Sequence, residues 1–354
     1  MGLRADHFTL ARILLLPLPV ALLHGGSPAW SLAAFTLLGL TDLVDGPLAR
    51  RHGSSPFGPL LDNLADRLFL AVVYCVLAEF GIVPLLLFQA MLAREFLVVA
   101  LRGLFRQDLR AWRGGQLKTT VQMFGAGFLL LLHVSPDGPW FTLAAAVALA
   151  ASAGLGVVIG ARARRLDWRA AWGVGLSAGL LAARLSGGAS MARDGTLFVI
   201  AGVTFVSAAR LLVRFRAEIL AAMRGRPAHA IHVLAVSCLV PLLWAPQLSR
   251  GPLAAMIATG IVASELAILV LGNTLNERGH AVRMGPEVLR LVVLGIAGLA
   301  TGIAGRDSSA GLAIALAALA VLGTLLFVRG RAVAQALSVP APPGAGRARL
   351  EPAR

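Results

Sequence analysis

Apolar residues run through the chain in long stretches that short polar segments separate. We place apolar spans at about 8–24, 30–49, 60–80, 83–104, 118–134 and 139–160, and a second set at about 170–186, 195–215, 228–246, 252–273, 286–303 and 309–329. Each span is close to the ~20 residues that a helix needs to cross the hydrocarbon of a bilayer. The pattern therefore predicts an all-α, polytopic integral membrane protein with about twelve transmembrane helices in two six-helix halves.

The distribution of charge adds an orientation to this picture. Of the residues, 58% are hydrophobic and 14% are charged, and loops rich in arginine alternate with loops that have almost none. This alternation predicts that the N-terminus, the basic loops and the C-terminus face the cytoplasm. The net charge of +15 is spread over these loops, so we expect no nucleic-acid partner. Residues 334–354, rich in Pro, Gly and Arg, predict a disordered cytoplasmic tail.

The two halves carry the same residue at several matching positions. An offset of 163 aligns Thr41 with Thr204, and an offset of 170 aligns Glu95 with Glu265. Matches between charged residues carry the most weight because charges are rare in this chain. We therefore expect residues 1–162 to form one six-span domain and residues 163–333 to form a degenerate copy of it. Fusion of an independent six-span unit, or chance matching, are the alternatives.

One stretch, residues 41–67, concentrates carboxylates in apolar surroundings. Asp42 and Asp45 share one helix face, and Asp62 and Asp66 share a face of the next helix. The short connection lets the two helices run antiparallel, so the four carboxylates would repel one another unless a cation binds. Oxygen ligands favour a hard ion such as Mg²⁺, Mn²⁺ or Ca²⁺. Ion pairs with nearby arginines are the structural alternative, although acids inside a membrane usually mark a functional site.

The spacing of these residues resembles the signature of the CDP-alcohol phosphatidyltransferase family, D-x2-D-G-x2-A-R followed by G-x3-D-x3-D. Every fixed residue of this signature is present, namely Asp42, Asp45, Gly46, Ala49, Arg50, Gly58, Asp62 and Asp66. The spacer between the two parts has seven residues, where eight is common in the family. Eight identities at fixed spacing make this a specific match.

The resemblance implies an enzyme that moves a phosphatidyl group from CDP-diacylglycerol to a polar alcohol and releases CMP. Mg²⁺ or Mn²⁺ would be the cofactor, with Asp66 as the general base. The metal ligands would be Asp42, Asp45, Asp62 and Asp66. Contacts to the CDP-lipid would come from Gly46, Ala49, Arg50 and Gly58. The resemblance also implies a bacterial-type inner (plasma) membrane, membrane lipids as surroundings, a cytoplasmic active site, and a homodimer or an intrachain pseudo-dimer.

Two later segments, "AREFLVVALR" and "GGQLKTTVQM", resemble the phosphatidylglycerophosphate synthase branch of this family. Lys118 is the only lysine among 32 basic residues, which indicates that a compact ammonium is needed there. The resemblance implies glycerol 3-phosphate as the acceptor, and we assign its phosphate to Arg94, Arg102 and Lys118. Gln116 departs from the branch pattern, and anchoring of basic residues at the membrane surface is the alternative for these three.

Other functions remain open on the sequence alone. The acceptor could be inositol phosphate, serine or another alcohol, and a twelve-span transporter would also place acids in the membrane. The carboxylates, however, all lie in one half and near one membrane face. At the aligned positions, the second half has Phe205, Ala208, Gly225 and His229, and Lys118 becomes Val288. The second half is therefore expected to hold no metal and to act as a pseudo-partner.

Overall fold

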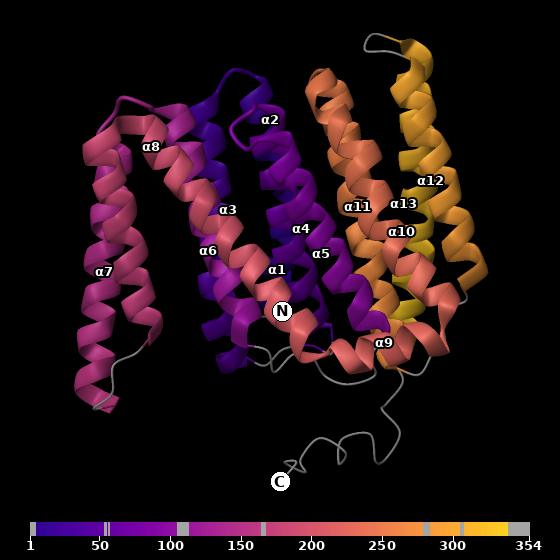
Figure 1. The fold of residues 1–354 in the computed structure, drawn as a ribbon, viewed down its shortest axis with the longest axis horizontal. Coiled ribbons are helices and arrows are strands. Elements are labelled where there is room, and N and C mark those ends of the chain that lie inside the picture. The colour runs from indigo at the N-terminus through magenta and orange to yellow at the C-terminus, as the bar shows by residue number, and fades with distance from the viewer. Residues whose placement is uncertain are drawn as a thin grey trace.

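The computed structural model describes residues 5–52, 55, 57–104, 113–163, 168–278, 284–304 and 308–338. Throughout these ranges the secondary structure is helical and no strand occurs. The helices are α1 (Ala5–Leu15), α2 (Pro17–His24), α3 (Pro28–His52), α4 (Gly58–Glu79), α5 (Leu85–Leu104), α6 (Arg113–Val134), α7 (Trp140–Ala163), α8 (Trp168–Arg214), α9 (Arg216–Gly225), α10 (Pro227–Trp244), the short 3₁₀ helix η2 (Ala245–Arg250), α11 (Pro252–Glu277), α12 (Met284–Ala304) and α13 (Ser309–Ser338). Figure 1 shows them as a broad slab with α7 near one edge and α12 near the other.

A helix lies in every predicted apolar range. Two of the ranges fall in α8, which breaks at Gly188, where the backbone has φ +69° and ψ −155°. Such a conformation is open to glycine because it has no Cβ. In the described chain, six helices are long and apolar enough to cross a bilayer by length and composition. The all-α membrane class is thus confirmed, whereas the number of twelve spans stays a prediction.

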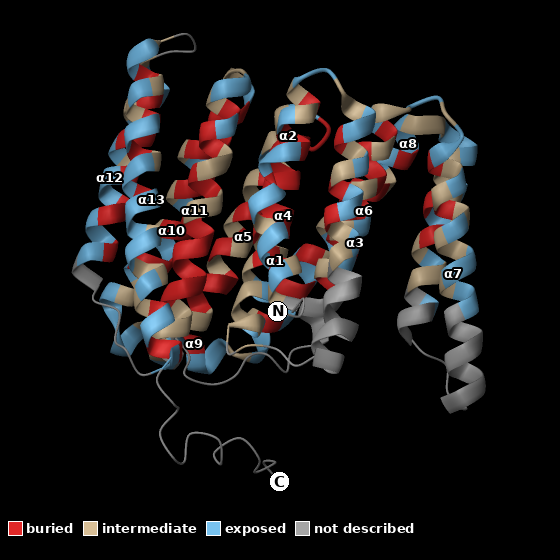
Figure 2. Cartoon of the chain, turned by 180° about the vertical axis from the view of Figure 1, so that it is seen from behind, coloured by how far each residue is buried: buried red, intermediate tan, exposed pale blue. Residues whose placement is uncertain are grey.

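The outer surface of the slab is apolar, as lipid requires. Large side chains such as Leu86, Phe198 and Ile303 are 79%, 80% and 86% exposed. Figure 2 shows exposed residues on the outward helix faces and buried residues where helices meet. Helices satisfy their backbone groups internally, so an apolar exterior of this kind suits the hydrocarbon region.

The two halves meet along their central helices. In this contact α4 packs against α11, and α5 packs against both α10 and α11. Asn273 and Asn276 of α11 donate to the carbonyls of Val99 and Gly103 of α5, each at 2.7 Å. Helix α8 instead crosses to the N-terminal half and packs against α6 and α7 (Figure 1). The C-terminal half therefore flanks α4, α5 and α6 on two sides.

Candidate active site

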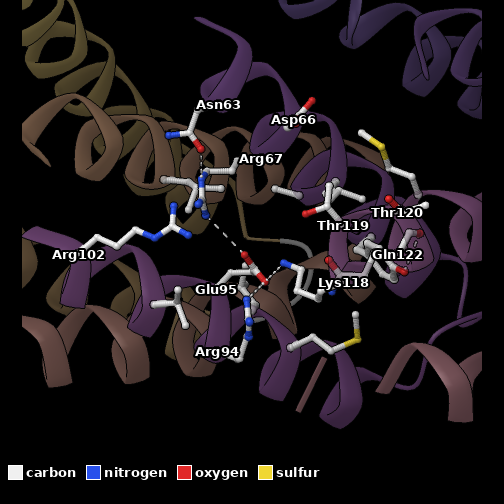
Figure 3. A pocket seen from close by; sticks show the side chains of 18 of the residues that line it. Asn63, Asp66, Arg67, Arg94, Glu95, Arg102, Lys118, Thr119, Thr120 and Gln122 are labelled. Atoms are coloured by element: carbon white, nitrogen blue, oxygen red, sulfur yellow. Dashed lines mark hydrogen bonds and ion pairs between the residues drawn. The ribbon is translucent and has the colours of Figure 1, made fainter. Parts of the chain in front are cut away.

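A cavity of about 540 Å³ lies among α4, α5 and α6. Its polar wall residues (Figure 3) include Asp62, Asn63, Asp66, Arg67, Arg94, Glu95, Arg102, Lys118, Thr119 and Gln122. Asp62 lies near the start of α4, Arg102 near the end of α5 and Lys118 near the start of α6. Glu95 lies nine residues before the end of α5, which places it roughly 13 Å deeper along that helix. The cavity thus extends inward from one end of the bundle.

The deep part of the cavity holds three cations around a single carboxylate. Arg94 Nη1 lies 2.7 Å from Glu95 Oε1, and Arg67 Nη1 lies 3.6 Å from Glu95 Oε2. The ammonium of Lys118 donates to Glu95 Oε1 as well. We call Arg67, Arg94 and Lys118 the basic cluster. Because Glu95 balances only one of these charges, the basic cluster keeps an excess of positive charge, which suits an anionic ligand.

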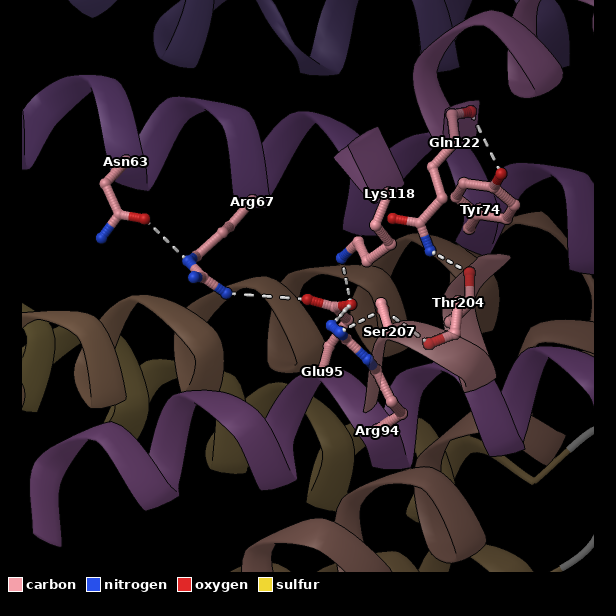
Figure 4. Close-up of polar contacts among 9 residues, drawn as sticks. All are labelled: Asn63, Arg67, Tyr74, Arg94, Glu95, Lys118, Gln122, Thr204 and Ser207. Carbon is pink, nitrogen blue, oxygen red and sulfur yellow. Dashed lines mark hydrogen bonds and ion pairs between the residues drawn. The ribbon is translucent and has the colours of Figure 1, made fainter. Parts of the chain in front are cut away.

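Neighbouring side chains hold this arrangement in place (Figure 4). Asn63 Oδ1 accepts from Arg67 Nε at 2.9 Å, one helical turn away. The hydroxyl of Tyr74 donates to the backbone carbonyl of Gln122 at 3.1 Å and ties α4 to α6. Lys118 is only 4% exposed and Arg94 only 8%. A buried charge is tolerated only when it is paired, so Glu95 and the basic cluster stabilise one another.

The acidic part of the cavity lies on α4. Asp66 accepts a charged hydrogen bond from Arg12 Nη1 of α1 at 3.2 Å. Arg12 is 1% exposed and also donates from Nε to Thr41 Oγ1 of α3 at 3.1 Å. Asp62 lies one turn before Asp66 and is exposed. Arg12 therefore fixes the position of Asp66 relative to the middle of α3.

The structure places five of the predicted site residues in one cavity: Asp62, Asp66, Arg94, Arg102 and Lys118. Gly58 is the first residue of α4. The others belong to α3 by their backbone, but their side chains lie outside the described residues; these are Asp42, Asp45, Gly46, Ala49 and Arg50. Where side chains are described, no group of three or more possible metal ligands occurs. Asp62 and Asp66 supply two carboxylates, of the oxygen type that hard ions prefer.

Sequence reasoning did not identify the central role of Glu95 or the ion pair that Arg67 makes with it. For Arg12, in the first apolar span, the sequence left a site role and membrane anchoring equally open. Glu95 was visible as an acid in an apolar span, which is a sign of function. The four-residue spacing of Asn63 and Arg67 was also visible in the sequence. Arg12 and Asp66 are 54 residues apart in the sequence, and no local sequence pattern predicts their contact.

Comparison with known proteins locates this region in a family. A model of the family described as CDP-alcohol phosphatidyltransferase matches residues 3–159. A CDP-diacylglycerol–glycerol-3-phosphate 3-phosphatidyltransferase of Rickettsia typhi is 35% identical over 133 residues, which make up 36% of this chain and 75% of that protein. A cardiolipin synthase (CMP-forming) of Streptomyces coelicolor is 36% identical over 141 residues, 38% of this chain and 63% of that protein. No solved structure matches the chain.

The matched region contains the whole carboxylate signature and the three helices that carry the polar wall of the cavity. The identity with the Rickettsia typhi protein extends over three quarters of that enzyme. Residues after 159 lie beyond the family model. On these grounds, the chain belongs to the CDP-alcohol phosphatidyltransferase family.

Proposed function

We propose that this enzyme transfers the phosphatidyl group of CDP-diacylglycerol to glycerol 3-phosphate and releases CMP, forming phosphatidylglycerophosphate. The observation that carries the proposal is a single cavity with carboxylates on α4 and an excess of cations around Glu95. Several relatives are named as transferases to glycerol 3-phosphate, which supports this acceptor. Family membership also favours an enzyme over the twelve-span transporter.

Glycerol 3-phosphate has a dianionic phosphate at one end and a hydroxyl at the other, and the cavity has matching ends. The basic cluster and Arg102 bind the phosphate, with the fork of each guanidinium donating to its oxygens. Held in this way, the acceptor directs its hydroxyl toward Asp66. Orienting the two reactants before reaction lowers the barrier, because their relative freedom is lost on binding.

Asp66 acts as the general base in the transfer. Its carboxylate takes the proton of the acceptor hydroxyl, and the resulting oxygen attacks the phosphorus on the lipid side of the pyrophosphate. A new P–O bond forms to the acceptor, the P–O bond to CMP breaks, and CMP leaves with the electron pair. Arg12 keeps the Asp66 carboxylate at a fixed position during this step.

A divalent ion, Mg²⁺ or Mn²⁺, is assigned to Asp42, Asp45, Asp62 and Asp66. The family is generally dependent on divalent metals. When bound, the ion would neutralise the pyrophosphate and the charge that develops on the departing CMP. We assign binding of the CDP-lipid to the last two turns of α3 and the start of α4, through Gly46, Ala49, Arg50 and Gly58. Gly46 and Ala49 are small, which leaves room for the nucleotide beside the helix.

We place the cavity at the cytoplasmic surface of a bacterial-type inner membrane. The positive-inside pattern of the loops supports this orientation, because the cavity begins at the helix ends that the basic loops connect. There an acyl-chained nucleotide lipid meets a water-soluble acceptor.

Residues 163–333 are proposed to replace the partner subunit of a homodimer. The offsets of 163 and 170 pair α4 with α10 and α5 with α11. If each helix is replaced by the other member of its pair, the α4–α11 contact becomes the α10–α5 contact, and both contacts occur. Contacts at a two-fold interface are related in this way. Helix α8 departs from this symmetry, since it packs on α6 and α7. A mass measurement of the purified particle in detergent tests the idea: one chain per particle supports an intrachain partner, and two chains support a homodimer.

The function is tested by CMP release from CDP-diacylglycerol in the presence of Mg²⁺ or Mn²⁺. Glycerol 3-phosphate, phosphatidylglycerol, inositol 1-phosphate and serine are offered separately. We expect release with glycerol 3-phosphate alone and a loss of about 10³-fold in Asp66→Asn, in the range typical of a removed general base. Asp194→Asn, which changes an exposed carboxylate on α8, is the matched control.

Each other result has a definite meaning. Release with phosphatidylglycerol instead would assign the reaction of the Streptomyces coelicolor relative and overturn the acceptor. Release with inositol 1-phosphate or serine would keep the chemistry and change the acceptor class. No release with any acceptor would overturn the proposed function.

A further inference from the structure

One face of α8 packs behind the acceptor end of the cavity, although this helix belongs to the C-terminal half. Ile200, Thr204, Ser207 and Leu211 are spaced four, three and four residues apart, so they share one side of the helix. Leu211 is part of the cavity wall. The family model ends at residue 159, so this face lies outside the part of the chain that the family accounts for.

Ser207 holds Arg94. Arg94 Nη2 donates to Ser207 Oγ at 2.8 Å, and this oxygen in turn donates its own hydrogen to the carbonyl of Thr204 at 2.8 Å. The hydroxyl is therefore oriented with a lone pair toward the guanidinium. Arg94 Nη1 is bound to Glu95, so two partners on different helices fix the plane of the guanidinium. Arg94 Nε is buried and has no hydrogen-bond partner in the described chain, so a donor is left over for a ligand.

Thr204 holds Gln122 in the same way. Gln122 Nε2 donates to Thr204 Oγ1 at 3.0 Å, and both residues are buried. Gln122 lies one helical turn after Lys118 on α6. Holding Gln122 in place therefore also helps to fix where the Lys118 ammonium lies. The two hydroxyls of α8 thus contact α5 and α6, two of the three helices that carry the acceptor cations (Figure 4).

A glycine lets α8 come this close. A Cβ placed on Gly125 of α6 would lie 2.5 Å from Ile200 Cδ1 and 2.7 Å from Ile200 Cγ1. Any larger residue would force the Ile200 side chain or the helices to shift, at a point one turn from the Gln122–Thr204 contact. The approach of α8 to the site is therefore built into the packing of both helices.

We propose that Ser207 and Thr204 are positioning residues of the acceptor-phosphate site, contributed by the C-terminal half. They act through Arg94 and Gln122 and need not touch the substrate. This inference rests on the proposed function, because it takes the ligand of the basic cluster to be the phosphate of the acceptor. It gives the C-terminal half a part in substrate binding through Arg94 and Gln122, beyond that of a packing partner.

The test measures KM for glycerol 3-phosphate, KM for CDP-diacylglycerol and binding of inorganic phosphate in four purified full-length variants. For Ser207→Ala and Thr204→Val we expect KM for glycerol 3-phosphate to rise about tenfold and inorganic phosphate to bind about tenfold more weakly. The reason is that Arg94 loses its hydrogen bond to Ser207 in the first variant, and Gln122 loses its hydrogen bond to Thr204 in the second. KM for CDP-diacylglycerol stays within twofold. Ser207→Thr, which keeps the hydroxyl, restores the wild-type values.

Thr196→Val on the same helix is the matched control. Thr196 is 1% exposed, and its hydroxyl donates at 2.7 Å only within α8, to the carbonyl of Ala192. The positioning role is overturned if Ser207→Ala leaves KM for glycerol 3-phosphate unchanged. It is also overturned if KM for glycerol 3-phosphate and KM for CDP-diacylglycerol change equally, and the control Thr196→Val changes as much. If the wild type binds inorganic phosphate but does not use glycerol 3-phosphate, the proposed acceptor is wrong. The phosphate affinities of the variants then decide whether Ser207 positions Arg94. If the wild type neither binds phosphate nor uses glycerol 3-phosphate, both proposals fail.

Discussion

Two glutamates at matching positions, Glu95 in α5 and Glu265 in α11, have opposite surroundings. The Glu95 side chain is 20% exposed, borders the cavity of about 540 Å³ and faces three cations. Glu265 is fully buried, and the cavity near it, lined by Glu287 and Arg329, measures about 60 Å³. One glutamate belongs to an open site and the other to a closed one.

The closed site contains its own counter-charges. Arg290 Nη2 lies 3.3 Å from Glu265 and 3.1 Å from Glu287. Arg329 enters from α13, pairs with Glu287 and donates to the carbonyl of Ile268 at 3.0 Å. Two carboxylates therefore meet two guanidinium groups, and the charges balance without a ligand.

The difference shows how a binding site is distinguished from a structural ion network. Around Glu95, the excess positive charge attracts an anion, and the cavity has room to hold it. Around Glu265 the charges balance, and the nearby cavity measures only about 60 Å³. We therefore expect substitutions in the first cluster to change activity and substitutions in the second to change stability.

The largest effect is expected for Lys118→Met. Removing the ammonium takes away a charged contact to the acceptor phosphate and leaves Glu95 with fewer cations, so kcat/KM for glycerol 3-phosphate should fall about 10³-fold, or ~4 kcal/mol. Steady-state CMP release measures it. Lys118→Arg keeps the charge and should recover part of the loss. A fall of less than tenfold would contradict a role for Lys118 in the site.

The comparison itself is tested by making the same change in both glutamates. Glu265→Gln leaves Arg290 with one carboxylate in a buried site, which should lower the free energy of unfolding by about 3 kcal/mol while the folded enzyme keeps its kcat. Glu95→Gln should lower kcat/KM for the acceptor by about 10²-fold, because the basic cluster loses the group that orients it. Thermal unfolding and CMP release are measured on both. If Glu265→Gln lowers kcat as much as Glu95→Gln does, the two clusters do not differ in role.

A smaller effect is expected for Arg329→Met. This change leaves Glu287 paired with Arg290, and the side chain of Arg329 is 17% exposed, so solvent compensates part of the loss. We expect a decrease of about 2 kcal/mol in the free energy of unfolding and unchanged KM values. Arg331→Met, two residues later on the same helix, should change neither. A rise in KM for either substrate would show that the closed cluster is coupled to the active site.

The smallest effect is expected for His232→Gln. His232 Nε2 lies 3.7 Å from Glu287, beyond the distance of a hydrogen bond, so it adds little to the network. The free energy of unfolding should change by less than about 1 kcal/mol, with activity unaffected. A loss comparable with that of Arg329→Met would mean that the closed cluster depends on the imidazole.

Much of the fold followed from the sequence because it depends on local periodicity. Apolar runs near the length of a bilayer predicted where the helices lie, since a backbone in lipid must satisfy its hydrogen bonds within each helix. The four-residue spacing of Asp62 and Asp66 likewise predicted that they share a face. The count of spans and the relation between the halves are not settled by these patterns, because a break such as that at Gly188 and the packing of α8 depend on the neighbours.

For this protein, then, the sequence by itself determined the helical membrane class, the carboxylates on α4 and the singular position of Lys118. Only the tertiary structure decided that Glu95 joins three cations, that Arg12 reaches Asp66, and that Thr204 and Ser207 of α8 hold two residues of the cavity wall. The reason is physical. The position of a side chain on its own helix is fixed by 3.6-residue geometry. The partner that it meets, up to 174 residues away, is fixed by how closely helices pack, as at Gly125.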